Sequence, residues 1–382
     1  MKILVYEWNG FCQKDLRAAL LELGHRVERI GYVVREQCGD AFFEEKLAER
    51  LKRGYDMVIS FNYYPSVGKC CHEAGIPYLS WIYDGDIHGI YHTSAFYDTN
   101  YIFTFDRAML KRLKEKGLSQ VWYLPLGVNT TRLDAIPYLP EEQKIFGADI
   151  SFIGNLYRNK NSLDSITLSD YDSGYLEAIL KAQVEINFNS LLEELLTPEL
   201  IQTIAAQMPE MDSRYTLTYA ESIRNLMATA VTKRERQEVL KQLSEHYEVS
   251  LYTFGEAKSL PKVKNCGIAS YFNTMPRIFK HSKINLNMTH RMIFTGIPLR
   301  IMDVLGVGGF LMTDYQSDME GVMLDGEHLA IYYSVEDLIE KVGFYLEHPE
   351  ERKRIAQNGY RLAREEFALT RLLPQMFTLA GI

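Results

Sequence analysis

Ile3-Leu-Val-Tyr6 opens the chain, followed by Asp15-Leu-Arg-Ala-Ala-Leu-Leu-Glu-Leu23, Gly24 and His25-Arg-Val-Glu-Arg-Ile30. The first run is short and wholly apolar, which favours a buried strand. In the second, apolar residues recur at helical spacing, and Gly24 stands where a C-cap glycine belongs. The third run is extended again. This order predicts a β-α-β unit, and such units build parallel sheets.

The same alternation continues for about a hundred residues. Glycines at 54, 75 and 117 each close a helical run, and an apolar run follows. The predicted strands of this part cover 3–6, 25–30, 56–61, 77–82, 101–105 and 121–124. They fit one doubly wound α/β domain.

A linker is indicated by Pro137, Pro140 and Glu141-Glu142. Beyond it, strands are predicted at 149–153, 249–254, 283–288, 309–313 and 329–333, with a mostly helical stretch between about 160 and 245. The sequence therefore predicts two Rossmann-like domains, 1–140 and 141–365, with the helical stretch inserted in the second. Residues 366–382 are expected to form a helix that packs back on the first domain. Two such domains bring the carboxyl ends of both sheets to one cleft.

Composition narrows the class of protein. A chain of 382 residues usually forms more than one domain, and a net charge of −8 argues against a nucleic-acid-binding protein. Five cysteines, two of them adjacent and none in a C-x-x-C pair, suggest reduced thiols and a cytoplasmic protein. No apolar run reaches the length of a transmembrane helix.

One segment of the second half carries the clearest functional pattern: Gly296-Ile-Pro-Leu-Arg300-Ile-Met-Asp303, followed by Gly308-Gly309-Phe-Leu-Met-Thr-Asp314. It predicts a turn, a short helix, a glycine turn and a buried strand. Free N–H groups at a helix N-terminus bind phosphate, and Asp303 has the chemistry to accept hydrogen bonds from a ribose diol. An ordinary αβ unit with a partly exposed Asp fits the same spacing.

Four segments together resemble a known family. They are Lys283 to Asp303 with the Gly308 to Tyr315 continuation, Trp81-Ile-Tyr-Asp84, Leu124-Pro-Leu126, and Ser151-Phe-Ile-Gly154-Asn155 with Arg158. In order and spacing they resemble the glycosyltransferases related to the spore-maturation protein CgeB. The resemblance covers most of the chain and is weakest over 160–245.

The resemblance implies a GT-B fold and a hexosyltransferase. A sugar would pass from a UDP- or dTDP-sugar bound on the C-terminal domain to a glycan or protein acceptor on the N-terminal one. Many GT-B enzymes carry an E-x7-E pair, but here the two positions are Thr295 and Asp303. This departure leaves the donor sugar and the stereochemical outcome open.

Donor-binding residues are predicted from these motifs. Arg158 and Lys160 are the candidate cations for the departing diphosphate, and the main-chain N–H groups near Gly296 to Leu299 are the candidate donors. The donor set is Gly154, Asn155, Arg158, Lys160, Gly255, Tyr271, His290, Thr295, Gly296, Ile297, Pro298, Leu299, Arg300 and Asp303.

Catalytic candidates are Asp84, His88 and Arg158. Asp84 follows a predicted strand at its carboxyl end, where it is suited to act as general base on the acceptor hydroxyl. The loop Glu7, Asn9 and Gly10 is expected to contact the acceptor or the donor.

No metal or other cofactor is expected. Asp84-Gly-Asp86 is a D-x-D only in the acceptor half, and the spacing of His88 and His92 is a weak metal pattern. Two other functions remain open: a GT-B nucleotide-sugar epimerase, and a non-catalytic nucleotide-binding scaffold. A NAD-dependent oxidoreductase is disfavoured, because the first βα turn lacks G-x-G-x-x-G.

Overall fold

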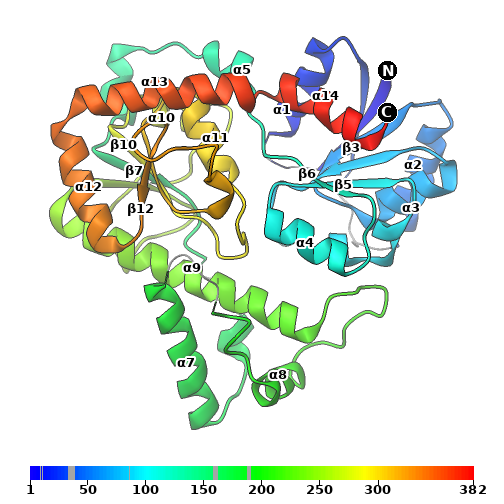
Figure 1. Cartoon of the computed structure of the whole chain (residues 1–382), viewed down its shortest axis with the longest axis horizontal. Helices are drawn as coiled ribbons and strands as arrows, with labels where there is room; N and C mark the ends of the chain where they lie inside the picture. The colour runs from blue at the N-terminus through cyan, green and yellow to red at the C-terminus, as the bar shows by residue number, and fades with distance from the viewer. Residues whose placement is uncertain (9, 11, 33–38, 86, 158–161, 187–190) are drawn as a thin grey trace.

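Two parallel six-stranded sheets make up the framework of the protein (Figure 1). The computed structural model describes residues 1–8, 10, 12–32, 39–85, 87–157, 162–186 and 191–382. The predicted fold class, an α/β protein with two Rossmann-like sheets, is confirmed.

The first sheet has the order β2-β1-β3-β4-β5-β6. Its strands are β1 (Lys2–Glu7), β2 (Arg26–Gly31), β3 (Met57–Phe61), β4 (Tyr78–Trp81), β5 (Asn100–Thr104) and β6 (Val121–Tyr123). Each matches a predicted strand within two residues. Its helices are α1 (Gln13–Glu22), α2 (Ala41–Leu51), α3 (Pro65–Ala74), α4 (Arg107–Glu115) and α5 (Thr130–Asp134), with 3-10 turns η1 (His88–Tyr91) and η2 (Thr93–Phe96). The strand order reverses between β1 and β3, where doubly wound sheets bind ligands.

The second sheet has the order β12-β11-β10-β7-β8-β9. Its strands are β7 (Ile150–Ile153), β8 (Val249–Tyr252), β9 (Lys264–Asn265), β10 (Ile284–Asn287), β11 (Leu311–Asp314) and β12 (Ala330–Tyr332). The sequence predicted all except β9, a two-residue exposed strand. Around them lie α6 (Gln143–Phe146), α10 (Thr274–His281), α11 (Leu299–Gly306), α12 (Val335–Glu347) and α13 (Pro349–Glu366), with 3-10 turns η3 (Pro140–Glu142) and η5 (Ser317–Met319). The order of this sheet reverses between β7 and β10.

A helical insertion follows β7 and reaches back to the first domain. It contains η4 (Ser162–Ser165), α7 (Asp170–Glu185), α8 (Pro198–Ala205) and α9 (Tyr219–His246), and α9 runs beneath both domains in Figure 1. Before α9, the N–H of Thr216 donates to the carbonyl of Tyr91 at 2.8 Å. Lys116, which directly follows α4, contacts this insertion: its Nζ lies 2.9 Å from a Glu221 oxygen.

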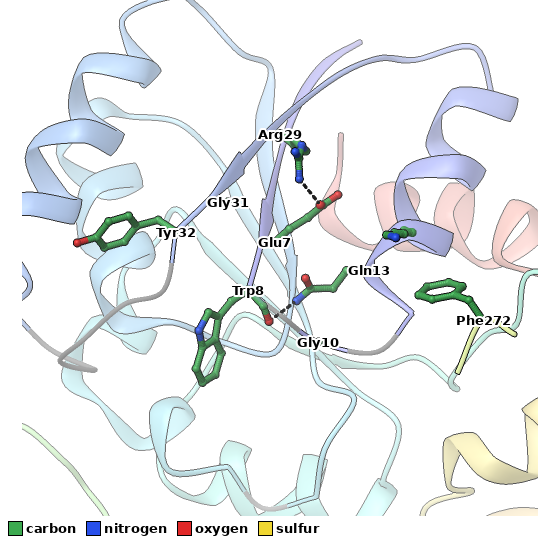
Figure 2. A pocket seen from close by; sticks show the side chains of 9 residues that line it. Glu7, Trp8, Gly10, Gln13, Arg29, Gly31, Tyr32 and Phe272 are labelled. Atoms are coloured by element: carbon green, nitrogen blue, oxygen red, sulfur yellow. Dashed lines mark hydrogen bonds and ion pairs between the residues drawn. The ribbon is translucent and has the colours of Figure 1, made fainter. Parts of the chain in front are cut away.

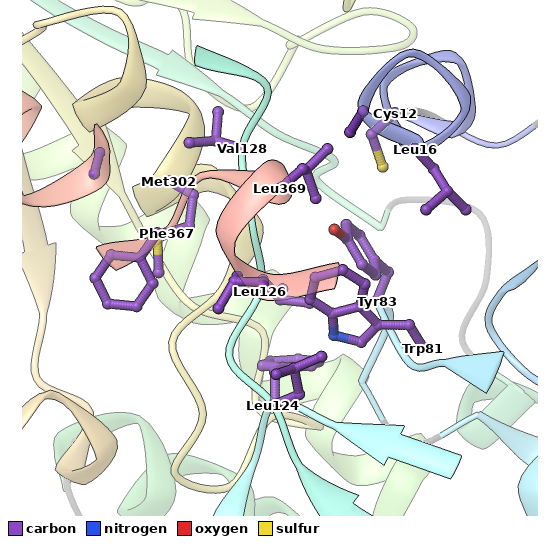
Figure 3. Close-up of a cluster of buried hydrophobic side chains, with 14 of the residues drawn as sticks. Cys12, Leu16, Trp81, Tyr83, Leu124, Leu126, Val128, Met302, Phe367 and Leu369 are labelled. Atoms are coloured by element: carbon purple, nitrogen blue, oxygen red, sulfur yellow. The ribbon is translucent and has the colours of Figure 1, made fainter. Parts of the chain in front are cut away.

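One apolar core runs through both domains. Figure 3 shows Trp81, Tyr83 and Leu126 of the first domain in the same cluster as Met302 and Phe367 of the second. The last helix, α14 (Leu369–Ala380), leaves α13 and packs on α1 (Figure 1). Main-chain hydrogen bonds hold it there: the N–H of Val128 donates to the carbonyl of Phe367 at 2.8 Å, and that of Leu369 to Val128 at 3.0 Å.

Candidate functional site

Asp84, the predicted general base, is held by a residue that the sequence did not single out. Asn62 follows β3 and has a φ of 61°, an uncommon value for a non-glycine residue. Its Nδ2 donates to Asp84 Oδ2 at 2.6 Å, and its Oδ1 accepts the N–H groups of Tyr83 at 2.9 Å and Asp84 at 3.2 Å. Asn62 therefore fixes the loop that presents the carboxylate. Its only sequence signal is a lone polar residue after a strand.

Asp84 lines a hollow of about 150 Å³ at the reversal point of the first sheet. Described residues around it are Trp8, Asn62, Tyr63, Tyr64, Pro65, Asp84, Ile87, His88 and Gly89. Both Asp84 and His88 are exposed. The hollow thus combines aromatic walls with a carboxylate and an imidazole, a suitable surface for a polar ring-shaped ligand.

His88 and His92, whose spacing is a weak metal pattern, pack against the same aromatic ring. The rings of His88 and His92 lie 4.0 and 5.1 Å from the ring of Tyr215, which belongs to the helical insertion. Among the described residues, no group of three His, Cys, Asp or Glu side chains is arranged to hold a metal ion.

In the second domain, several residues predicted to bind the donor lie at the reversal point between β7 and β10. Gly154 and Asn155 follow β7, and the Tyr157 ring lies 4.9 Å from the ring of His290, which follows β10. Arg236 of α9, which the sequence did not single out, donates from Nη1 to the carbonyl of Asn155 and from Nη2 to that of Met288, both at 2.7 Å. It thereby joins the two loops. Arg158, Lys160 and Asn9 lie outside the described residues.

His290 is held in its neutral form. Burial and the nearby cations Arg236 and Arg291 lower its pKa to about 3. Its Nδ1 accepts the N–H of Met292 at 3.0 Å, which assigns the proton of the neutral ring to Nε2. His290 is therefore suited to donate a hydrogen bond rather than to carry charge.

The loops of the two halves meet across the cleft. A Cβ atom added at Gly85, next to Asp84, would lie 3.2 Å from Met292 Cβ, two residues beyond His290. The acid of the first domain and the neutral histidine of the second thus belong to loops in contact.

The turn predicted to bind phosphate is partly occupied by a carboxylate of the first domain. Asp106 Oδ2 accepts the N–H groups of Phe294 at 2.6 Å, Thr295 at 3.0 Å and Gly296 at 3.2 Å. A Cβ at Gly296 would lie 2.8 Å from the carbonyl of Phe105, so glycine permits this close approach. Thr295 and Gly296 are thus interdomain contacts in this conformation. Ile297 is buried, Pro298 is the N-cap residue of α11, and Leu299 and Arg300 are the first residues of this helix.

Asp303 is buried between the domains, with an exposed fraction of 4%. Its Oδ1 accepts the hydroxyl of Tyr271 at 3.0 Å, and its Oδ2 accepts Arg300 Nη1 at 3.1 Å. Burial raises its pKa to about 6. A ribose would have to replace one of these two partners.

Two further predicted donor residues are also engaged within the protein. Tyr271 is 8% exposed and packs its ring 5.4 Å from the guanidinium of Arg132, so its face is not free for a base. Gly255 follows β8 with a φ of 85°, and its carbonyl accepts Asn265 Nδ2 at 2.9 Å.

Comparisons with known proteins bear on the family and the fold. Residues 234–377 match a family described as glycosyl transferase-like. A sequence comparison with curated proteins gives no match. No helix among the described residues is long and apolar enough to cross a membrane.

Three solved structures are similar over the whole chain. Sucrose-phosphate synthase from Thermosynechococcus elongatus has a TM-score of 0.56 at 10% identity, covering 100% of this chain and 98% of its own. Anabaena Alr3699/HepE, solved in complex with UDP and glucose, has a TM-score of 0.55 at 11% identity, covering 100% of both chains. A glycosyltransferase from Rickettsia africae has a TM-score of 0.53 at 10% identity, covering 100% and 97%. This chain therefore has the GT-B fold, and its residues 234–377 carry the glycosyl transferase-like family signature.

Proposed function

We propose that this protein is a metal-independent glycosyltransferase of the CgeB-like kind, which transfers a hexose from a UDP- or dTDP-sugar to a hydroxyl group of a glycan or protein. The observation that carries the proposal is the contact between the Asp84 loop and the His290 loop across the cleft. Each of these loops lies near the reversal point of its own sheet, and one carries a carboxylate while the other carries a hydrogen-bond donor. The UDP and glucose bound in the Anabaena relative support a UDP-sugar donor.

The reaction needs charge stabilisation on the donor side. As the bond from the sugar to the diphosphate breaks, the diphosphate gains negative charge, and fixed donors that face it lower the barrier. Arg158, Lys160 and the first turn of α11 are the proposed donors. His290 donates from Nε2 to the donor sugar or its phosphate. Asp303 binds the ribose after giving up Tyr271 or Arg300.

On the acceptor side, Asp84 takes the proton of the attacking hydroxyl. Its Oδ2 is held by Asn62, so Oδ1 is the oxygen proposed to accept the proton. His88, in the same hollow, is the second candidate for this role.

The first test is nucleotide binding followed by turnover. UDP or dTDP is expected to raise the melting temperature, because a ligand of the native state stabilises it. Release of UDP from UDP-glucose is then measured with and without a glycan pool, in buffer containing EDTA. Acceptor-dependent release in EDTA supports transfer. Conversion of the donor to an isomer would indicate an epimerase, binding without turnover a scaffold, and restoration by Mn²⁺ alone a metal enzyme.

The second test separates the two halves. Asp84→Asn is expected to slow transfer by about 100- to 10,000-fold while UDP affinity stays unchanged. Glu45→Gln, a change at an exposed acid on α2, is the matched control. Arg158→Gln is expected to slow transfer and donor hydrolysis alike, since it acts on the leaving group. Loss of UDP binding in Asp84→Asn would contradict the assignment of the halves.

A further inference from the structure

A second and larger hollow lies on the other side of Trp8. It measures about 430 Å³ and opens where β1 and β2 end and α1 begins (Figure 2). Trp8 lines both this hollow and the one that contains Asp84. A ligand that extends past the indole of Trp8 would therefore reach from this hollow to the hollow that contains Asp84.

The described ionic groups of this hollow carry an excess of positive charge. Glu7 is its acid, and its carboxylate oxygens lie 3.0 Å from Arg17 Nη1 and 3.5 Å from Arg29 Nη1. Arg29 lines the hollow, and Figure 2 shows it beside Glu7. Lys14 lines it as well. Two cations, Arg29 and Lys14, therefore line the hollow with one carboxylate, Glu7, and the Arg29 side chain remains 63% exposed.

The side chains that line this hollow suit a ligand that combines a ring with a charged group. Trp8 is 41% exposed, and Phe272 enters from the C-terminal domain, with Lys14 Nζ 5.2 Å from the centre of its ring. Gln13 Nε2 donates to the carbonyl of Trp8 at 3.0 Å. Aromatic faces pack against the apolar faces of sugars, while the cations attract an anion.

We propose that this hollow binds an anionic group, a phosphate or a carboxylate, on the sugar acceptor. The acceptor hydroxyl lies at Asp84, and the charged group lies beyond Trp8 at Arg29 and Lys14. This inference rests on the proposed function and adds the substrate class: the acceptor is an acidic or phosphorylated sugar rather than a neutral one.

The test measures sugar binding to protein saturated with UDP, so that the donor phosphate site is filled. Tryptophan fluorescence is titrated with glucose 6-phosphate, glucuronate and glucose. The parent is expected to bind at least one charged sugar ten or more times more tightly than glucose, and the preference is expected to shrink at high salt. Glucose 6-phosphate and glucuronate distinguish a phosphate from a carboxylate.

Variants locate the effect. The double variant Arg29→Gln, Lys14→Gln is expected to lose the preference and keep its UDP affinity, while Arg29→Lys keeps the preference. Arg26→Gln is the matched control, because Arg26 also lies on β2 and is 77% exposed but does not line the hollow.

Three results would overturn the proposal: no preference for a charged sugar in the parent, an unchanged preference in the double variant, or an equal loss in Arg26→Gln. Loss of UDP binding in the double variant would also overturn it, by assigning the hollow to the donor. Absence of binding of both UDP and dTDP to the parent would refute the proposed function itself.

Discussion

Asp106 and Thr295 are joined by two hydrogen bonds across the domain boundary, from the main-chain N–H and from the hydroxyl of the threonine, both at 3.0 Å. The same carboxylate caps α4 by accepting the N–H of Met109 at 2.9 Å. The Asp106 side chain therefore caps a helix of the first domain and also accepts hydrogen bonds from a turn of the second domain.

Replacing Asp106 with Ala is expected to cost about 3 kcal/mol of unfolding free energy, because a helix cap and charged hydrogen bonds to three N–H groups are lost together. Asp40→Ala is the control: Asp40 caps α2 through the N–H of Phe43 at 3.0 Å. It is expected to cost about 1 kcal/mol. Urea unfolding measures the free energy of unfolding of both variants. Equal losses in the two variants would mean that the interdomain hydrogen bonds of Asp106 do not contribute to stability.

Asp303 gives the protein a specific pH dependence. Its pKa in the folded state is raised to about 6 from the ordinary value of 3.8, so between these pH values the folded state binds a proton that the unfolded state has released. Its contribution to stability is therefore present in full well below pH 3.8 and is lost as the pH rises through 6. Relative to Asp303→Asn, the parent is expected to lose about 2 kcal/mol more between pH 4 and 7. Parallel pH profiles of the two proteins would contradict this.

Asn62→Gly is expected to slow transfer by about 10- to 100-fold, less than the loss of the base itself, and to leave UDP affinity unchanged. Glycine tolerates the positive φ, so the change removes the side chain that holds Asp84 without straining the turn. Steady-state rates and calorimetry with UDP measure the two quantities. An unchanged transfer rate would show that Asp84 does not need the Asn62 side chain to hold it in position.

His290 is expected to remain neutral throughout the range in which ordinary histidines titrate. Its pKa of about 3 reflects burial beside Arg236 and Arg291. In ¹H–¹⁵N spectra, the imidazole signals that disappear in His290→Gln should not move between pH 5 and 8. A midpoint near 6.5 would mean that the ring is solvated and open to ligands without displacement of its neighbours.

The sequence predicted the sheets well because buried parallel strands are short, largely apolar runs, as at 56–61 and 309–313, and glycines stand before both of these runs. It did not predict β9, whose two residues are exposed and carry no apolar pattern. The order of strands in the two sheets, and hence their reversal points, became visible only in the structure.

Candidate site residues that follow strands could be predicted from the sequence. Residues whose contacts join segments far apart in the chain were harder to predict. Asp84 was proposed because it follows a predicted strand, and His290 because it precedes the predicted phosphate turn. Asp106 and Arg236 were missed, because a cap residue and a helical arginine look ordinary until their partners, Gly296 and Asn155, are brought beside them. The burial of Asp303 has the same origin, since the atoms that cover it come from elsewhere in the chain.

The packing of α14 on α1 has a consequence for biosynthesis. Leu372, Leu373 and Met376 of α14 are buried in a cluster that also contains Leu16 and Leu20 of α1. A ribosome releases α1 early, whereas α14 follows every other helix described here. The nascent first domain therefore carries an uncovered apolar surface until the final turns emerge. This interval is when the growing polypeptide is most exposed to aggregation or to capture by a chaperone.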